Sequence, residues 1–402
     1  MGPESFVAHE FVESAIVNMK KSIGDEKVLV AVSGGVDSVT CAVLTHEAIG
    51  ERLVCVILDD AFMRQGEPEY VASTLSKPPF NVPMKIVNVR ERFLKAMNGL
   101  GDAEEKRKMF RETFYQVLGE TARNEACSVL VQGTIRADIM ETVGGIKTQH
   151  NVLEQIGINP MERFGFKVVE PLLPLFKEQV RSIARHFGLP AEFSERQPFP
   201  GPGLSVRNVG QIRPDKLDAL KRANTIVEHE FSKHKPEQYF AVIVDNEETV
   251  QQTKALHIQE TVARRLNIPS RNVRAKIFTD KATGVEGGKR RYGDVVGVLV
   301  QTLGGKLHQT SIQSIISLQA AIITENPGVA RVFYAVRDIA KKKPYIVGMR
   351  AVQTKDFLTA TVSEIPWTTL DKAAEEIIGQ CSNVSTVYYD VTPKPPATIE
   401  ME

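Results

Sequence analysis

The stretch that most constrains the fold is residues 27–40, KVLVAVSGGVDSVT, near the start of the chain. Its first part, Val28–Val32, is an almost unbroken apolar run, which is typical of a buried central strand. The next part, Ser33–Ser38, interrupts that pattern with SGGVDS, and residues 39–46 have a helical composition with few breakers. A strand, a tight Gly-Gly turn and a helix N-terminus together predict an anion site, because backbone N–H groups converge there and the helix dipole adds partial positive charge.

The polar side chains of this turn narrow the kind of anion. Ser33 and Ser38 can add hydroxyl donors, but a carboxylate such as Asp37 beside phosphates is repulsive unless a divalent cation lies between them. We therefore predict a nucleotide polyphosphate site with magnesium, and Asp37 as its metal ligand. A purely structural alternative is a strand-to-helix turn in which Ser or Asp is only a helix cap. The string lacks the G-K-[ST] ending of a Walker A loop, and it resembles the pyrophosphate loop of the ATP pyrophosphatase superfamily, whose members split ATP into AMP and pyrophosphate.

Length and composition limit the class of protein. A chain of 402 residues predicts two or three domains. Its 50 basic and 49 acidic residues give a net charge of +1, so no overall field favours a nucleic-acid partner. The four cysteines are scattered without a C-x-x-C pair, which argues against a zinc site or a disulfide framework and suits a reducing compartment. The sequence shows no long apolar segment or signal sequence, so we expect a cytoplasmic protein without a membrane partner.

The first half of the chain alternates predicted strands with predicted helices. Strands are expected at Val28–Val32, Leu53–Leu58, Met84–Val89, Ser128–Gln132 and Lys167–Pro174, and helices at 5–24, 39–46, 102–124 and 177–189. This alternation predicts a parallel sheet covered on both faces, with ligands at the C-terminal ends of its strands. The proline- and glycine-rich residues 196–204, RQPFPGPGL, can be neither helix nor central strand. We therefore expect a hinge there, between a domain of residues 1–203 and one of residues 204–402.

Several polar residues of the first half are candidates for the site. Gly133 follows a predicted strand and permits a close approach of a ligand to the backbone. Asp138 and Glu141 could bind magnesium, or they could cap the following turn. The polar residues 146–151, IKTQHN, are consistent with a lid, whereas the charged run 102–108 has the default interpretation of a solvated helix face.

The second half contains a weak internal repeat. Residues 287–302 (GGKRRYGDVVGVLVQT) and 341–354 (KKKPYIVGMRAVQT) each combine a basic cluster, an apolar strand and the ending V-Q-T. A predicted helix and strand follow both segments. We therefore expect two related α+β lobes, at about residues 204–335 and 336–402, and we interpret the basic clusters as solvated strand starts rather than as binding patches.

The assembled motifs resemble the GMP synthases over nearly the whole chain, without a glutaminase domain. The matching strings are SGGVDS, EEKRK, QGTIRADIME, IKTQHN, VEPL, RQPFPGPGL, RAVQTKDFLTA and YYDVTPKPPATIEME. That family activates the C2 oxygen of xanthosine monophosphate (XMP) with ATP and releases pyrophosphate, after which ammonia displaces AMP to give GMP. The resemblance implies a C–N ligase of the α/β class, with a parallel-sheet ATP pyrophosphatase domain (adenine nucleotide alpha hydrolase-like) followed by a two-lobed α+β dimerisation domain.

The resemblance also implies roles for individual residues. The ATP-binding residues would be Ser33, Gly34, Gly35, Val36, Asp37, Ser38, Leu58 and Gly133. The catalytic residues would be Asp37, Asp138, Glu141 and Lys147, with Asp37 on the metal and Lys147 neutralising the adenylyl transition state. The XMP-binding residues would be Arg107, Gln238, Lys394, Ile399 and Glu400.

The implied cofactor is Mg²⁺, with ATP as co-substrate, and the implied partners are a second copy of the chain and a separate glutaminase subunit that supplies ammonia. Two alternatives stay open. One is a paralogue that adenylates a different carbonyl acceptor, and the other is a non-catalytic, nucleotide-binding regulatory subunit. The presence of Asp37, Lys147 and Lys394 argues against the second alternative.

Overall fold

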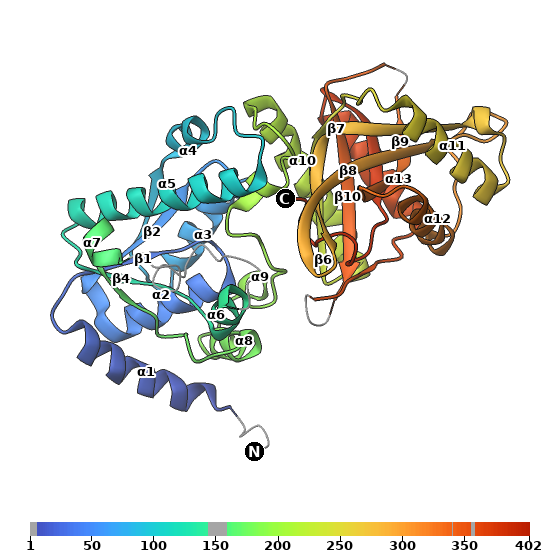
Figure 1. Ribbon diagram of the computed structural model, residues 1–402. Coiled ribbons are helices and arrows are strands. Elements are labelled where there is room, and N and C mark those ends of the chain that lie inside the picture. The colour runs from blue at the N-terminus through green and yellow to red at the C-terminus, as the bar shows by residue number, and fades with distance from the viewer. Residues whose placement is uncertain (1–5, 144–158, 340, 355–357) are drawn as a thin grey trace. The chain divides into compact units, whose positions relative to one another are not determined.

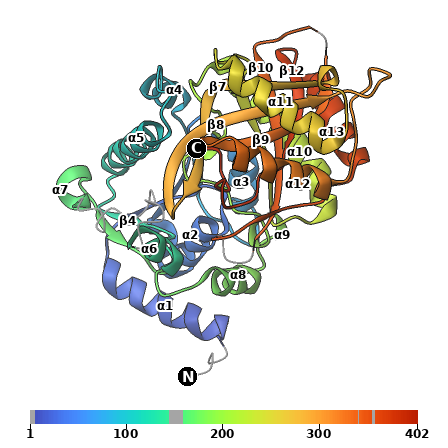
Figure 2. The same cartoon turned by 45° about the vertical axis from the view of Figure 1, so that its right-hand side comes forward.

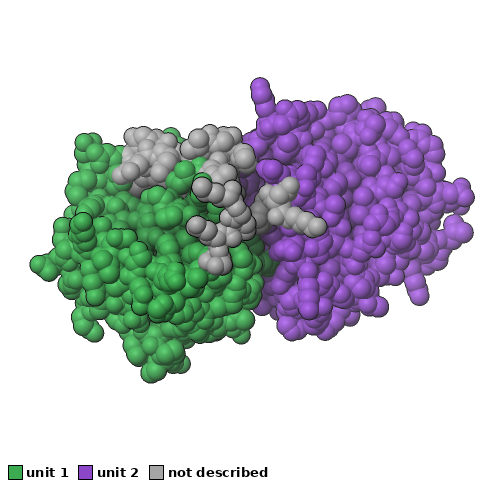
Figure 3. All heavy atoms as spheres, turned by 90° about the horizontal axis from the view of Figure 1, so that it is seen from below, with its two compact units in different colours: residues 1–96, 108–202 green, residues 97–107, 203–402 purple. Residues whose placement is uncertain are grey.

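The computed structural model describes residues 6–143, 159–339, 341–354 and 358–402. The chain forms two compact units, which Figure 3 distinguishes by colour. The first unit contains residues 1–96 and 108–202, and the second contains residues 97–107 and 203–402. The change at residue 202 lies within the proline-rich segment.

The first unit is built on a five-stranded sheet with the order β3-β2-β1-β4-β5. Its strands are β1 (Val28–Ala31), β2 (Leu53–Asp59), β3 (Met84–Asn88), β4 (Val129–Val131) and β5 (Lys167–Val169). Every neighbouring pair is parallel, which confirms the predicted α/β class. The prediction of a strand that continues to Pro174 is wrong, because β5 ends at Val169. The chain then turns, and the Leu175 N–H donates to the Leu172 carbonyl at 2.9 Å.

Helices cover both faces of this sheet. Helices α1 (Ala8–Ile23), α2 (Val36–Ile49) and α8 (Lys177–His186) share one apolar cluster with Val28 and Val30 of β1. Because side chains alternate along a strand, the buried Leu29 points to the other face. In Figure 1, α4 (Arg90–Ala96) and α5 (Ala103–Asn124) lie on the opposite side of the sheet from α1 and α8. The other helices of the first unit are α3 (Glu67–Leu75), α6 (Arg136–Val143), α7 (Pro160–Phe164) and α9 (Ala191–Ser194).

The strand order places a ligand-binding crevice between β1 and β4. From β1 the chain builds outward through β2 and β3, then crosses to β4 on the other side. The two helical connections that leave β1 and β4 therefore diverge to opposite sides, and ligands of open parallel sheets bind at such switch points, outside the C-terminal strand ends. Residues 33–38 follow β1, and Gly133 follows β4, so both predicted loops belong to this crevice.

The second unit is built on a seven-stranded mixed sheet with the order β11-β10-β12-β9-β8-β7, and β6 pairs with β10. Its strands are β6 (Gln238–Asp245), β7 (Val273–Glu286), β8 (Lys289–Val300), β9 (Val329–Asp338), β10 (Tyr345–Gln353), β11 (Thr361–Val362) and β12 (Val384–Asp390). The pairs β8–β9 and β10–β12 are parallel, whereas β7–β8 and β6–β10 are antiparallel. Strands from both of the predicted lobes lie in this one sheet.

Four helices pack on the strands of the second sheet. Helices α10 (Pro214–Phe231), α13 (Trp367–Gln380), α12 (Ile312–Glu325) and α11 (Gln252–Leu266) contact β6, β12, β9 and β7, respectively, and Figure 2 shows them grouped together. A separate apolar cluster includes Phe240, Phe333 and, from the C-terminal tail, Met401. None of the described helices is both long and apolar enough to cross a membrane.

Candidate active site

The turn from β1 into α2 is held by short contacts within the turn itself. Gly34 has φ +78°, which a residue with a side chain rarely adopts. The Ser38 hydroxyl accepts from the Ser33 N–H at 3.1 Å and donates to the Gly35 carbonyl at 3.0 Å. Helix α2 begins at Val36 rather than at the predicted Val39, with Gly35 as its N-cap. The first N–H groups of a helix have no partners within it, so this fixed turn presents backbone donors suited to phosphate oxygens.

Gly133 brings the end of β4 against the same turn. A Cβ atom at this position would lie 2.7 Å from the Asp37 carbonyl oxygen and 3.0 Å from the Ser38 nitrogen. Only a residue without a side chain allows the two backbones to lie this close. The structure thus brings together two sequence-predicted segments that are about a hundred residues apart. Leu58, another predicted ATP-binding residue, is buried near the end of β2.

The Asp37 carboxylate is paired on one oxygen only. Its Oδ2 accepts from Lys177 Nζ at 2.6 Å, whereas its Oδ1 is buried and has no hydrogen-bond partner among the described residues. Burial raises the pKa of Asp37 above its usual value, the Lys177 ammonium opposes that shift, and the charge of Asp138 adds to it. A cation bound to Oδ1 would therefore stabilise the charged form of this carboxylate.

Magnesium fits this donor set. It is commonly held by one or two carboxylates together with phosphate oxygens and water. Within the described parts of the chain, no group of three or more His, Cys, Asp and Glu side chains could hold a metal. A magnesium ion at Asp37 would therefore take most of its ligands from a nucleotide and from water.

Of the remaining predicted catalytic residues, the structure describes the side chain of Asp138 only. Asp138 Oδ2 accepts from the Ile135 N–H at 3.1 Å, at the start of α6. Glu141 belongs to α6, but its side chain is not among those described. Lys147, like all of residues 146–151, lies outside the described residues.

Two residues at this site were missed in the sequence analysis. Lys177, the first residue of α8, holds Asp37, and Arg196 donates to the Gly34 carbonyl at 3.1 Å. A single lysine at a helix start carries no sequence signal. Arg196 opens the proline-rich segment, whose composition indicates a hinge and whose string matches the GMP synthases, but neither signal points to a contact with the turn.

In the second unit, the C-terminal tail (residues 394–402) carries three of the predicted XMP-binding residues, and two of them, Ile399 and Glu400, are held by arginines. The Glu400 carboxylate forms a bidentate ion pair with Arg207: Oε2 accepts from Nε and Oε1 accepts from Nη2, both at 2.9 Å. The Ile399 carbonyl accepts from Arg350 Nε at 2.8 Å. Arg207 is fully buried and was also missed, because its partner is 193 residues away in the sequence.

The other three predicted XMP-binding residues have different surroundings. Arg107 donates to the main-chain oxygen of Glu402, and burial lowers the pKa of its guanidinium. Gln238 is buried at the start of β6. Lys394 exchanges two backbone hydrogen bonds with Ala360, at 2.8 and 2.9 Å. The structure therefore joins Arg107 to the tail and anchors the Lys394 backbone, and no described contact joins Gln238 to either.

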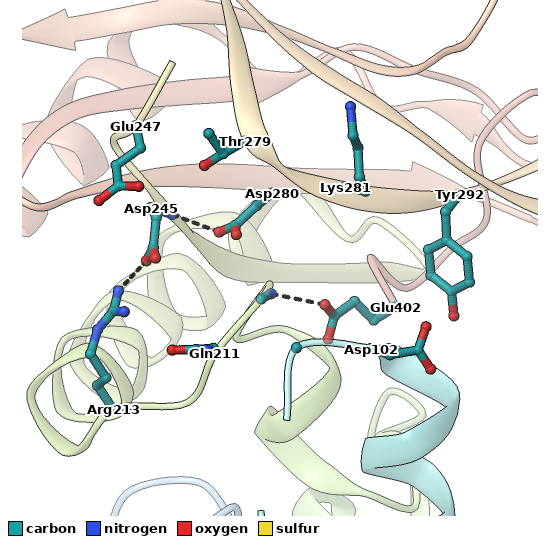
Figure 4. Close-up of a pocket in the computed structure, with 12 residues that line it drawn as sticks. Asp102, Gln211, Arg213, Asp245, Glu247, Thr279, Asp280, Lys281, Tyr292 and Glu402 are labelled. Carbon is teal, nitrogen blue, oxygen red and sulfur yellow. Dashed lines mark hydrogen bonds and ion pairs between the residues drawn. The ribbon is translucent and has the colours of Figure 1, made fainter. Parts of the chain in front are cut away.

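A cavity of about 680 Å³ lies within the second unit (Figure 4). None of the five predicted XMP-binding residues is among its described lining residues. Its lining contains two cations, Arg213 and Lys281, against the carboxylates of Asp102, Asp245, Glu247, Asp280 and Glu402. Three of these carboxylates are paired with buried lysines, Glu402 with Lys106 and both Asp245 and Asp280 with Lys216.

Fold and turn together define a PP-loop protein of the ATP pyrophosphatase type. Residues 8–191 match the family described as PP-loop domain, and residues 336–401 match the family described as GMP synthase C terminal domain.

Relatives that match along the whole chain are each named as a subunit of glutamine-hydrolyzing GMP synthase. The protein of Sulfurisphaera tokodaii is 38% identical over 99% of this chain and 100% of its own length. That of Saccharolobus solfataricus is 40% identical over 98% of both chains, and that of Methanopyrus kandleri is 37% identical over 99% of this chain and 100% of its own. The chain belongs to this family of GMP synthase subunits, which confirms the resemblance. Its enzyme class is that of the ligases that form carbon–nitrogen bonds.

The contact at Gly133 gives a first test. The substitution Gly133→Ala should push the turn away from β4 and weaken binding of magnesium-ATP by about tenfold or more, because the added methyl would overlap the Asp37 backbone. The matched control is Gly379→Ala in α13, where nothing lies within 4 Å of the added carbon. Calorimetric titration with a non-hydrolysable ATP analogue measures the affinity of each variant. Equal affinities in the two variants would contradict the claim that the close contact at Gly133 positions the ATP-binding turn.

The half-paired Asp37 gives a second test. Asp37→Asn should keep the fold but lower kcat at least about 100-fold, or about 3 kcal/mol of barrier, because a neutral amide holds a metal poorly. The exposed Asp25→Asn is the control with the same change of charge. Steady-state rates at saturating magnesium and melting temperatures are compared. A kcat close to that of the control would remove Asp37 from the catalytic set.

Proposed function

We propose that this chain is the synthetase component of a GMP synthase. It transfers the adenylyl group of ATP to the C2 oxygen of XMP, releases pyrophosphate, and then lets ammonia displace AMP to give GMP. The observation that carries the proposal is the SGGVDS turn with its half-paired Asp37, in a chain whose relatives of that name match from end to end. Conversion of XMP to GMP by the purified protein with magnesium, ATP and ammonium, followed by absorbance, is the direct assay.

The first unit would bind and cleave ATP. Backbone N–H groups of residues 34–38 and the hydroxyls of Ser33 and Ser38 would hold the phosphates, while Leu58 and Gly133 would border the adenosine. Magnesium, when bound, supplies positive charge for the departing pyrophosphate, and Asp37 is the residue that would hold it. Asp138, Glu141 and Lys147 would complete the set, with Lys147 neutralising charge on the transferred phosphoryl group. Such fixed donors and charges stabilise the transition state more than the bound substrate.

The second unit would bind XMP through Arg107, Gln238, Lys394, Ile399 and Glu400. Arginine and lysine side chains are suitable partners for a monophosphate. The pairing of Glu400 with Arg207 supports this role for the tail, because it holds the backbone in place at the residues that would contact XMP.

The nitrogen would reach the site as ammonia. All four cysteines lie in described parts of the chain and are buried, and burial raises the thiol pKa of each, to about 12 for Cys41. A glutaminase cysteine must react as an accessible thiolate. A separate glutamine-hydrolysing subunit would therefore supply the ammonia, and we further propose a homodimer in the cytoplasm.

The products of ATP cleavage test the reaction type. With XMP and ammonium, the protein should convert ATP into AMP and pyrophosphate in amounts equal to the GMP formed, and omission of magnesium should stop it. Chromatography of the nucleotides measures this, and omission of XMP is the control. ADP as the main product would contradict the proposal.

The nitrogen source gives a further test. The isolated chain should make GMP with ammonium but not with glutamine alone, because none of its cysteines can act as the glutaminase nucleophile. The rate at a fixed concentration of ammonium salt should rise with pH, since free ammonia is the nucleophile. Equal use of glutamine and ammonium by the isolated chain would disprove the two-subunit arrangement.

A further inference from the structure

A largely buried ion-pair cluster contacts the turn of residues 33–38 at Gly34. Arg196 Nη1 donates to the Gly34 carbonyl at 3.1 Å and lies 2.5 Å from Glu67 Oε1. The Glu67 side chain is only 3% exposed, and its Oε2 accepts from the Arg64 N–H at 3.0 Å. The Arg64 guanidinium in turn lies 4.1 Å from the ring centroid of Phe199. Arg196 and Phe199 of the proline-rich segment thus contact Glu67, at the start of α3, and the neighbouring Arg64. All four residues belong to the first unit.

The geometry of Gly34 shows why this contact matters. A peptide bond is planar and trans, so the Gly34 carbonyl and the Gly35 N–H point in opposite directions from the same plane. An arginine that holds the carbonyl therefore also aims the Gly35 N–H. Gly34, at φ +78°, has no side chain that would resist rotation of this peptide, and a Cβ there would lie 2.6 Å from Glu67 Oε1. The contacts within the turn hold the Ser33 N–H and the Gly35 carbonyl, whereas the Gly34 carbonyl is held by Arg196, which lies outside the turn.

We infer that Arg196 and Glu67 are positioning residues for ATP cleavage, which act by holding the Gly34–Gly35 peptide with its N–H directed at the phosphates. This rests on the proposed ATP-dependent reaction. Glu67 orients the guanidinium, and the guanidinium orients the peptide. The proline-rich segment provides a rigid support for Arg196, because its prolines have fixed φ angles.

The role predicts a separation of binding from catalysis. Donors aimed at the developing charge of pyrophosphate stabilise the transition state, so their misalignment should lower kcat more than ATP affinity. In Glu67→Gln, the two guanidinium groups of Arg64 and Arg196 lose their negative partner. That variant should bind ATP as well as the wild type or more tightly, with a lower kcat.

The experiment compares Arg196→Ala, Glu67→Gln and Arg185→Ala in the full chain. Arg185 is the matched control, because it is an arginine of the same unit whose pairs with Glu178 and Glu195 are exposed. Arg196→Ala should still fold, since Arg64 remains beside Glu67. We expect kcat to fall about tenfold or more in the first two variants and to stay unchanged in the third. Guanidinium ion at non-denaturing concentrations should partly restore Arg196→Ala.

A second readout does not depend on the acceptor. Hydrogen exchange of the peptide spanning residues 33–39 should speed up in Arg196→Ala and Glu67→Gln, but not in Arg185→Ala. If the wild type makes no GMP from XMP, the proposed function fails while this comparison still tests the positioning role. Unchanged exchange and kcat in Arg196→Ala would overturn the inference. So would a loss of kcat that follows the melting temperature and that guanidinium does not restore.

Discussion

The site in the first unit depends on one close contact between two backbone segments, the end of β4 and the turn that follows β1. Gly133 allows β4 to end against the carbonyl of Asp37, and Gly34 takes a left-handed conformation that turns β1 into α2. Without side chains at these two points, the helix N-terminus reaches the crevice at the switch point of the sheet. The positions of Asp37 and Lys177 follow from that arrangement, since each lies in the first turn of its helix, α2 or α8.

The second unit depends on a different interaction, the sharing of Asp390 by Arg331 and Arg350. All three side chains are fully buried, and Asp390 Oδ2 lies 3.0 and 2.7 Å from the two guanidinium groups. Burial and the neighbouring cation lower the pKa of Arg331 to about 9. Both arginines also donate to the tail: Arg331 to the Thr398 hydroxyl at 3.0 Å, and Arg350 to the Thr398 carbonyl at 2.9 Å. Removing one member of such a cluster leaves an unpaired buried charge, which typically costs about 3–5 kcal/mol. The order of the tail thus depends on charges that lie beneath it.

The sequence predicted the features whose signals are local. The apolar run of β1, the SGGVDS turn and the glycine after β4 each lie within a few residues, and the structure places them as expected. Lys177 and Arg196 contact the turn from 140 and 162 residues away, and nothing in their own neighbourhoods indicates those partners. The same holds for Arg207 and Glu400. The end of β5 was missed because Glu170–Leu175 is apolar enough to suggest a strand, whereas its backbone hydrogen bonds form turns. Local patterns therefore predicted the scaffold, while long-range ion pairs decide how the site is held.

The central claim is that the oxygen at C2 of XMP is activated by the adenylyl group of ATP. XMP labelled with ¹⁸O at C2, incubated with the protein, magnesium, ATP and ammonium, distinguishes this from other routes when the products are analysed by mass spectrometry. If the oxygen attacks the α-phosphorus and ammonia then breaks the bond from C2 to oxygen, the label must leave in AMP. Label in pyrophosphate or in water, with unlabelled AMP, would contradict the account.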